Sequence, residues 1–211
     1  MSSEIENLDK IYSEVFGDRI GTFLEIGAFD GESFSNTSFL ADNGWEGYYF
    51  EPLSEIAIEC AMRHINNNVK VIPCAVSDKD EILTLSLAGM MTSARKDHVE
   101  IYEKLDWGGS KANQGILRQV TAKGINTIIK KLKSCDLLVI DIEGFEPVVM
   151  NEWDFSILKP KIMIIETRDE DPDFPKYIQD EYRSMVCRII DSGYKIKMRD
   201  GSNLIFQGVD T

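Results

Sequence analysis

The stretch FLEIGAFDG, Phe23 to Gly31, decides how the rest of the sequence is interpreted. An apolar run ends there in small and acidic residues, as a buried strand does where it turns toward a helix at the edge of a parallel sheet. Gly27 lets a ligand approach the backbone closely, and Gly31 relieves a turn. Glu25 and Asp30 place negative charge where a dinucleotide phosphate would bind, and the GxGxxG spacing is absent. The sequence therefore favours a ligand without phosphate.

Apolar runs along the chain predict an α/β fold. Most of them are continuously apolar, which is typical of strands covered on both faces. Between two of these runs, residues 53–61 repeat apolar side chains at helical spacing. Strands that alternate with helices predict a parallel sheet with helices on both faces. The expected strands are residues 22–27, 47–50, 69–76, 137–142 and 162–165.

The C-terminal residues predict a different kind of pairing. In YKIKMRD, residues 194–200, apolar side chains alternate with basic ones, which is the pattern of a strand with one solvated face. Asp200 and Gly201 then form a tight turn into a second apolar run. A mainly parallel sheet is thus expected to end in an antiparallel hairpin.

The organisation of the chain is expected to be simple. Its 211 residues predict a single domain, residues 1–211. Apolar residues at helical spacing predict an N-terminal helix within residues 1–19. Residues 88–124 interrupt the alternation of strands and helices. We interpret them as an insertion at the rim of the sheet that covers the substrate site, with a surface loop of no special role as the alternative.

The composition restricts the classes of partner. A net charge of −13 argues against nucleic acid and against an anionic membrane surface. No apolar run approaches the ~20 residues of a membrane-spanning helix. The four cysteines form no CxxC pair and are expected to be reduced. The sequence predicts a cytoplasmic protein that acts on a small molecule and binds neither nucleic acid nor membrane, and its oligomeric state stays open.

Acidic residues accompany three successive predicted strands. Asp30 follows the first strand, Glu51 ends the second about 20 residues beyond Gly31, and Asp78 follows the third. A carboxylate at the second position is suited to accept hydrogen bonds from ribose hydroxyls, and Asp78 is suited to accept one from an adenine amino group. S-adenosylmethionine fits this arrangement because it carries a sulfonium and an ammonium besides the ribose and adenine. Each carboxylate taken alone is equally well explained as a solvated surface group.

Together these motifs resemble those of the FkbM-type S-adenosylmethionine-dependent methyltransferases. The resemblance rests on EIGAFDGESFSNTSFL, GWEGYYFEP, VKVIPCAVSD, DLLVIDIEGFE and KPKIMIIE, in that order. It implies a class I methyltransferase fold, which is Rossmann-like and has a mainly parallel seven-stranded sheet. It also implies S-adenosylmethionine as cofactor and S-adenosylhomocysteine as product. The cofactor contacts that it implies come from Glu25, Gly27, Asp30, Gly31, Asn36, Glu51, Asp78 and Asp141.

Methyl transfer to a hydroxyl requires alignment of the acceptor and removal of its proton. Asp141 and Glu143 stand two apart at the end of one predicted strand, and Glu166 ends the next. We expect these three residues to be catalytic, with Glu143 as the base and Asp141 also placing the methionine part of the cofactor. The motifs contain no histidine, which disfavours a divalent metal ion, although oxygen ligands alone can hold Mg²⁺.

Other polar and aromatic residues near these motifs have structural explanations. Glu146 precedes Pro147 at the start of a predicted helix, where an acidic residue is favourable. His64 and His98 share helical stripes with apolar residues, so packing is preferred to catalysis for both. Three aromatic residues either line the acceptor pocket or fill the core: Tyr102, Trp107 and Phe145.

The function that the sequence predicts is O-methylation of a small hydroxylated acceptor, such as a sugar or a natural-product intermediate. A nicotinamide-dependent oxidoreductase is the first alternative, since Glu51 suits a ribose equally well, but the third glycine of its motif is missing. A non-catalytic binding protein that has kept the fold is the second. The choice between O- and N-methylation stays open at this point.

Overall fold

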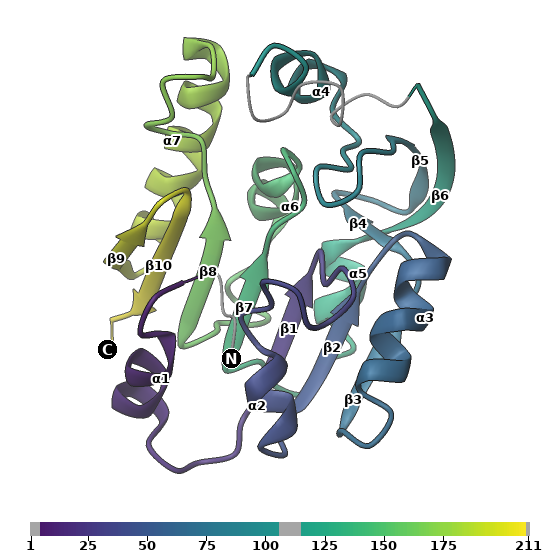
Figure 1. The fold of residues 1–211 in the computed structure, drawn as a ribbon. Coiled ribbons are helices and arrows are strands. Elements are labelled where there is room, and N and C mark those ends of the chain that lie inside the picture. Colours follow the sequence, from purple (N-terminus) through teal and green to yellow (C-terminus); the bar gives the residue numbers. More distant parts are fainter. Residues whose placement is uncertain (1–4, 106–114, 210–211) are drawn as a thin grey trace.

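A seven-stranded sheet forms the centre of the computed structural model, which describes residues 5–105 and 115–209 (Figure 1). Its strands follow the order β3-β2-β1-β7-β8-β10-β9. Neighbouring strands from β3 to β8 are parallel, and β10 is antiparallel to both β8 and β9. The predicted fold class is thus confirmed. The strands are β1 Thr22–Ile26, β2 Glu46–Phe50, β3 Val69–Ile72, β7 Leu137–Ile140, β8 Ile162–Glu166, β9 Tyr194–Asp200 and β10 Asn203–Gly208.

The strand order reverses between β1 and β7. From β1 the chain continues to β2 and β3 on one side of the sheet, whereas β7 and β8 extend it on the other. Ile26 pairs with Phe50 of β2 and with Ile140 of β7, so the carboxyl ends of the three strands meet at one edge. Open α/β sheets bind ligands at such a reversal.

Helices cover both faces of the sheet, and β1 shows why. Phe23 belongs to an apolar cluster that includes residues of α1 and α2, whereas Leu24 and Ile26 belong to a cluster that includes residues of α5, α6 and α7. Successive side chains of a strand point to opposite faces, so a continuously apolar strand must be covered twice. The helices are α1 Leu8–Phe16, α2 Ser38–Asp42, α3 Ser54–Arg63, α4 Lys96–Tyr102, α5 Ile125–Ile129, α6 Glu146–Glu152 and α7 Lys176–Asp191.

A second, three-stranded sheet stands beside the carboxyl edge of the large one (Figure 1). Its order is β4-β6-β5, with β6 parallel to β4 and antiparallel to β5. The prediction of one strand over residues 69–76 was therefore wrong. The chain leaves the large sheet after Ile72, and β4 joins the small one. The strands of this sheet are β4 Ala75–Ser77, β5 Glu81–Ser86 and β6 Leu117–Gly124.

The last part of the expected insertion, residues 88–124, is also regular structure. Residues 117–124 form β6, the central strand of the small sheet. Only Val120, Ala122 and Gly124 of this strand are buried, in strict alternation. A period of two is the mark of a strand with one covered face, and such a strand contains no continuous apolar run by which it could be predicted.

Three other expectations concern the N-terminal helix, membrane-spanning helices and the cysteines. The helix α1 lies inside the range 1–19, as predicted. Among the described residues, no helix has the length and apolar character needed to cross a membrane. All four cysteines are free thiols, and Cys60, Cys74 and Cys135 are buried.

Candidate functional site

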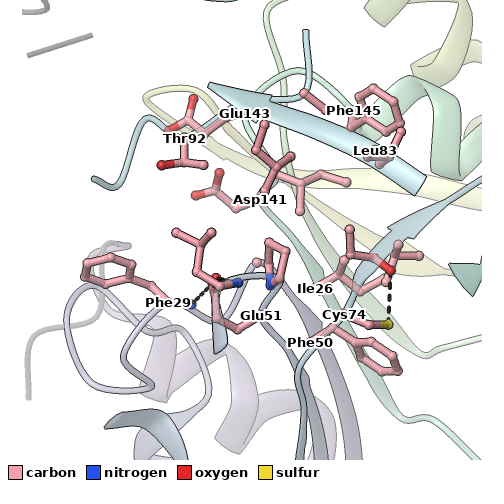
Figure 2. Close-up of a pocket in the computed structure, with 18 of the residues that line it drawn as sticks. Ile26, Phe29, Phe50, Glu51, Cys74, Leu83, Thr92, Asp141, Glu143 and Phe145 are labelled. Atoms are coloured by element: carbon pink, nitrogen blue, oxygen red, sulfur yellow. Dashed lines mark hydrogen bonds between the residues drawn. The ribbon is translucent and has the colours of Figure 1, made fainter. Parts of the chain in front are cut away.

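A pocket opens at the strand-order reversal, between the ends of β1, β2 and β7 and the small sheet (Figure 2). It encloses about 690 Å³, part of which is open to solvent. Glu51 and Phe29 lie on one side of it, and Asp141 and Glu143 lie on the other. The pocket therefore has one half at the ends of β1 and β2 and another at the end of β7.

Gly27 joins the two halves. Its φ of 91° lies in the left-handed region that only glycine adopts readily. A Cβ at this position would lie 1.7 Å from the carbonyl oxygen of Asp141, so there is no room for any side chain. The amides of Gly27 and Ala28 donate to the carbonyl of Phe50 at 3.0 and 3.1 Å. The predicted close approach of a ligand to the backbone at Gly27 is compatible with this position, since Gly27 lines the pocket.

Glu51 is held at the end of β2 with its carboxylate in the pocket lining. It accepts hydrogen bonds from the amide of Leu53 at 2.8 Å and from the amide of Phe29 at 3.2 Å. Burial raises the pKa of Glu51 to about 7, although both amides act in the opposite direction. A buried carboxylate in this place can accept hydrogen bonds from the hydroxyls of a ribose.

The wall beyond Glu51 is apolar. It is formed by the ends of β2 and β4, by β5, and by the residues between β2 and α3. An apolar slot next to a ribose-binding carboxylate has the chemistry that an adenine ring requires. The apolar lining residues of this wall are Phe50, Leu53, Cys74, Ala75, Val76, Leu83 and Leu85.

Asp78 is absent from the described lining of the pocket. Its carboxylate accepts a hydrogen bond from the Ser77 hydroxyl at 2.9 Å and lies 3.7 Å from the ammonium of Lys79. The side chain is 36% exposed. The structure thus places Asp78 at the surface beside the small sheet, because β4 has left the large sheet before this residue.

Four more of the residues that the resemblance implied shape the loop after β1 and do not line the described pocket. Glu25 is buried and accepts hydrogen bonds from the hydroxyls of Thr37 and Ser35. Asp30 accepts hydrogen bonds from the amide of Ser33 at 2.7 Å and from its hydroxyl at 2.6 Å. The other two members are Gly31, packed against Cys60 and His64, and Asn36, which is 4% exposed.

The three carboxylates expected to be catalytic are brought together. Oxygen atoms of Asp141, Glu143 and Glu166 all lie within 4.8 Å of one another. They come from the ends of β7 and β8, which are adjacent parallel strands. Burial raises the pKa of Glu166 well above its usual value, and the charges of Asp141 and Glu143 add to this effect. A carboxyl group with a raised pKa is suited to exchange a proton.

Arg168 is a member of this site that was missed at the sequence level. Its guanidinium lies 2.7 Å from Glu166 Oε1 and 3.7 Å from Glu143 Oε2, and it donates to the Tyr102 hydroxyl at 3.1 Å. Arg168 is only 8% exposed. One signal was available, because a single arginine stands two residues after the buried strand that Glu166 ends, inside an acidic run.

Glu146 does more than begin a helix. It is fully buried and accepts hydrogen bonds from the amide of Ile142 at 2.6 Å, the amide of Gly144 at 3.0 Å and the hydroxyl of Tyr182 at 2.6 Å. The favourable position at a helix start, which we expected to explain this residue, therefore accounts for only part of its role. Glu146 holds the turn that carries Glu143.

Both histidines are packed side chains, as expected. His64 is 3% exposed, contacts the carbonyl oxygen of Gly31 at 2.8 Å and stacks on Tyr49. His98 is fully buried beside Phe174. Of the three aromatic candidates, Phe145 lines the pocket, Tyr102 reaches Glu143, and Trp107 lies outside the described residues.

The three carboxylates also have the donor set of a divalent-cation site. Oxygen-only ligands suit Mg²⁺ or Ca²⁺. Glu166 Oε2 is buried and has no hydrogen-bond partner within the described part of the chain. The residues present thus fit such an ion as well as they fit proton transfer.

The fold and the position of the pocket define a class of protein. A mainly parallel seven-stranded sheet that ends in an antiparallel hairpin, with its pocket at the strand-order reversal, is the class I fold of the S-adenosylmethionine-dependent methyltransferases. Residues 25–196 match the model of the methyltransferase FkbM domain. The chain therefore belongs to the FkbM methyltransferase family, which confirms the family that the sequence motifs indicated.

Solved structures agree with this class. The FkbM methyltransferase of Methylobacillus flagellatus KT has a TM-score of 0.54 at 14% identity, over 90% of this chain and 44% of that one. The O-methyltransferase TomG of Streptomyces achromogenes, involved in tomaymycin synthesis and solved with S-adenosylmethionine, has a TM-score of 0.51 at 12% identity, over 97% and 78%. Aeropyrum pernix fibrillarin, also solved with S-adenosylmethionine, has a TM-score of 0.50 at 12% identity, over 95% and 74%.

The sequence identities to these solved structures are low. At such identities they establish the fold alone, and this chain spans less than half of the Methylobacillus protein, 44% of its length. No protein of curated function matches the sequence.

Proposed function

We propose that the protein binds S-adenosylmethionine in this pocket and transfers its methyl group to a hydroxyl of a small acceptor. The observation that carries the proposal is the division of one pocket into two halves. Glu51 and an apolar slot stand at one end, carboxylates stand at the other, and Gly27 joins them without a side chain. The S-adenosylmethionine complexes of two proteins with this fold support the choice of cofactor.

The residues that would hold the cofactor follow from its chemistry. Glu51 would accept hydrogen bonds from the ribose hydroxyls, and the apolar slot would receive the adenine. Asp141 would attract the ammonium and the sulfonium, because it faces the pocket from the end of β7. Glu25, Asp30, Gly31 and Asn36 would act on the cofactor only through the loop that they shape, and Asp78, outside the described pocket lining, would not contact it.

The bound cofactor supplies an electrophilic methyl group on a positively charged sulfur. The chain has to align the acceptor oxygen in line with that group and to remove the hydroxyl proton. Glu143 would accept this proton, since it lines the pocket beside Asp141. Glu166, which has a carboxylate oxygen within 4.8 Å of theirs, would share the proton through the cluster. Four residues of the insertion contribute to the pocket lining and would contact the acceptor: Gly89, Met90, Thr92 and Ala94.

A divalent cation is the second candidate for the activation of the hydroxyl. The convergence of three carboxylate oxygens within 4.8 Å favours it. A cation held there would lower the pKa of an acceptor hydroxyl without a protein base. Extensive dialysis against EDTA followed by addition of Mg²⁺ separates the two routes. Loss and recovery of methyl transfer support the cation, and an unchanged rate supports Glu143 as base.

Calorimetry with S-adenosylmethionine and S-adenosylhomocysteine tests the cofactor assignment. We expect saturable binding of both, weakened about 5- to 150-fold by Glu51→Ala if a buried contact worth about 1–3 kcal/mol is lost. Asp78→Ala is the matched control, because this carboxylate follows the next strand but lies outside the described pocket lining. Absence of saturable binding by wild-type protein would end the proposal. Equal affinities of the two variants would remove Glu51 from the site.

The acceptor is to be sought among small hydroxylated molecules. Cell extract incubated with the protein and methyl-labelled S-adenosylmethionine should yield a labelled small molecule, detected by mass shift. A labelled nucleic acid would contradict the proposed partner class, and a labelled amine would replace O- by N-methylation. The net charge of −13 and the free thiols support a cytoplasmic protein that acts on small molecules. A titration with NADH tests the oxidoreductase alternative.

A further inference from the structure

Glu143 has an unusual backbone conformation. Its φ is 53°, in the left-handed region that side chains other than those of Asn and Asp rarely adopt. Such a conformation is unfavourable and persists only where the surroundings enforce it. The next residue, Gly144, also has a positive φ, of 108°. The turn after β7 is therefore held in a shape that the local sequence does not favour.

Much of this enforcement comes from residues 93–102, which comprise α4 and the three residues before it. The Ser93 hydroxyl donates to the carbonyl oxygen of Glu143 at 2.6 Å. At the other end of α4, the Tyr102 hydroxyl donates to Glu143 Oε2 at 2.5 Å. Ser93 is 2% exposed and Tyr102 is 1% exposed, so water does not compete for either bond. Both the backbone and the carboxylate of Glu143 are thus held from the same short segment.

Gly144 is held by the same segment. The Arg95 guanidinium donates to its carbonyl oxygen at 3.4 Å. The ring of His98 lies so close that a Cβ on Gly144 would stand 2.6 Å from it. Burial and the charge of Arg95 lower the pKa of His98 to about 3, so the ring packs there as a neutral group.

We propose that Ser93 and Tyr102 are positioning residues, which clamp Glu143 in the orientation that it needs for methyl transfer. This inference rests on the proposed function, in which Glu143 faces the acceptor. It gives α4, which contributes no residue to the described pocket lining, a role in the site. Arg168 contributes to the same clamp, because it donates to the Tyr102 hydroxyl and thereby orients it toward Glu143.

Carbon NMR at a fixed pH tests the clamp without cofactor or acceptor. Glutamate carboxyl carbons are labelled, and the Glu143 signal is assigned by its loss in Glu143→Gln. Tyr102→Phe should shift this signal, since the carboxylate loses a hydrogen bond, whereas Tyr194→Phe should not. Tyr194 is the matched control: it is 2% exposed and its hydroxyl donates to the carbonyl of Pro160. An unshifted Glu143 signal in Tyr102→Phe would overturn the proposal.

Ser93→Ala serves as the second variant and keeps the proposal testable if Tyr102→Phe does not fold. Loss of the bond to the Glu143 carbonyl should broaden or double the Glu143 signal, because the strained turn gains an alternative conformation. A single sharp signal at the wild-type position would contradict the clamp.

The rate of methyl transfer gives the functional readout. With methyl-labelled S-adenosylmethionine and cell extract, Tyr102→Phe should form labelled product about tenfold more slowly than wild type, at unchanged affinity for the cofactor. Tyr194→Phe should keep the wild-type rate. An unchanged rate in Tyr102→Phe would remove the positioning role. If wild-type protein forms no labelled product, the proposed function fails, while the NMR result still decides whether the clamp exists.

Discussion

The two halves of the pocket are built in different ways. At the ends of β1 and β2, Glu51 is fixed by backbone amides, those of Leu53, 2 residues later, and of Phe29, 22 residues earlier. At the ends of β7 and β8, Glu143 is fixed by the hydroxyls of Ser93 and Tyr102, about 40 or 50 residues away in the chain. The half at Glu51, which we propose to hold the cofactor, thus depends on backbone amides, whereas the half at Glu143, which we propose to hold the acceptor, depends on side-chain hydroxyls. We expect changes in residues 88–124 to leave the position of Glu51 unaltered and to alter the position of Glu143.

The largest effect is expected at the joint between the halves. Gly27→Ala should abolish detectable cofactor binding and destabilise the fold by at least about 4 kcal/mol, because the added Cβ would stand 1.7 Å from the Asp141 carbonyl oxygen. Gly17→Ala is the control, since Gly17 also has a positive φ but open space around it. It should cost only about 1 kcal/mol. Urea unfolding and calorimetry measure both, and equal losses in the two variants would show that Gly27 is not a steric joint.

A smaller effect is expected at Arg168, whose guanidinium lies beside Glu143 and Glu166. Arg168→Met should destabilise the protein by about 3 kcal/mol at neutral pH, because Glu166 is left buried without its partner. Burial already raises the pKa of Glu166, and loss of Arg168 should raise it further. The penalty should therefore grow as the pH rises through the native-state pKa of Glu166, which lies well above the usual carboxyl value, and shrink at pH values below it.

The double variant Arg168→Met/Glu166→Gln sharpens this prediction. It removes the buried charge together with its partner and should recover part of the lost stability. Urea unfolding at acidic and at neutral pH gives the comparison. A penalty that does not change with pH would mean that Arg168 acts by packing on Phe174, whose ring centroid lies 5.1 Å from its guanidinium carbon.

The smallest effect concerns the charge of Glu51, the carboxylate that we propose to bind the ribose. Its pKa is raised to about 7 in the free protein, and hydrogen bonds from ribose hydroxyls to the carboxylate would lower it on binding. Binding should then release a proton, and affinity should be about tenfold higher at pH 8 than at pH 6. Calorimetry in buffers of different ionisation enthalpy measures the proton, and Glu51→Gln should flatten the profile. Proton uptake by wild-type protein would contradict the assignment.

The difference between the two halves of the pocket also explains how much the sequence could predict. The sheet, its hairpin and the grouping of Asp141, Glu143 and Glu166 followed from apolar runs and from the acidic residues at their ends. Those signals are local, and parallel strands end at a common edge. Strand ends alone did not separate Glu51, which lines the pocket, from Asp78, which does not. That difference arises because the chain changes sheets after Ile72, and only tertiary pairing reveals it.

The clamp on Glu143 was also beyond reach of the sequence. Ser93 and Tyr102 belong to a segment without a recognisable motif, and their partner is defined only once α4 packs against the turn after β7. Arg168 carried a weak signal, and Glu146 was attributed to helix geometry because its three hydrogen-bond donors could not be foreseen.

The pairing of β5 with β6 makes the chain tolerant of changes in the length of the segment between these strands. Ser86 and Leu117 are direct partners in that antiparallel pair, so the ends of the chain between them already lie side by side. Each doubling of the length of such a loop costs only about 0.6 kcal/mol in closure entropy. We therefore expect that residues 87–116 can be replaced by a segment of another length without separating β5 from β6.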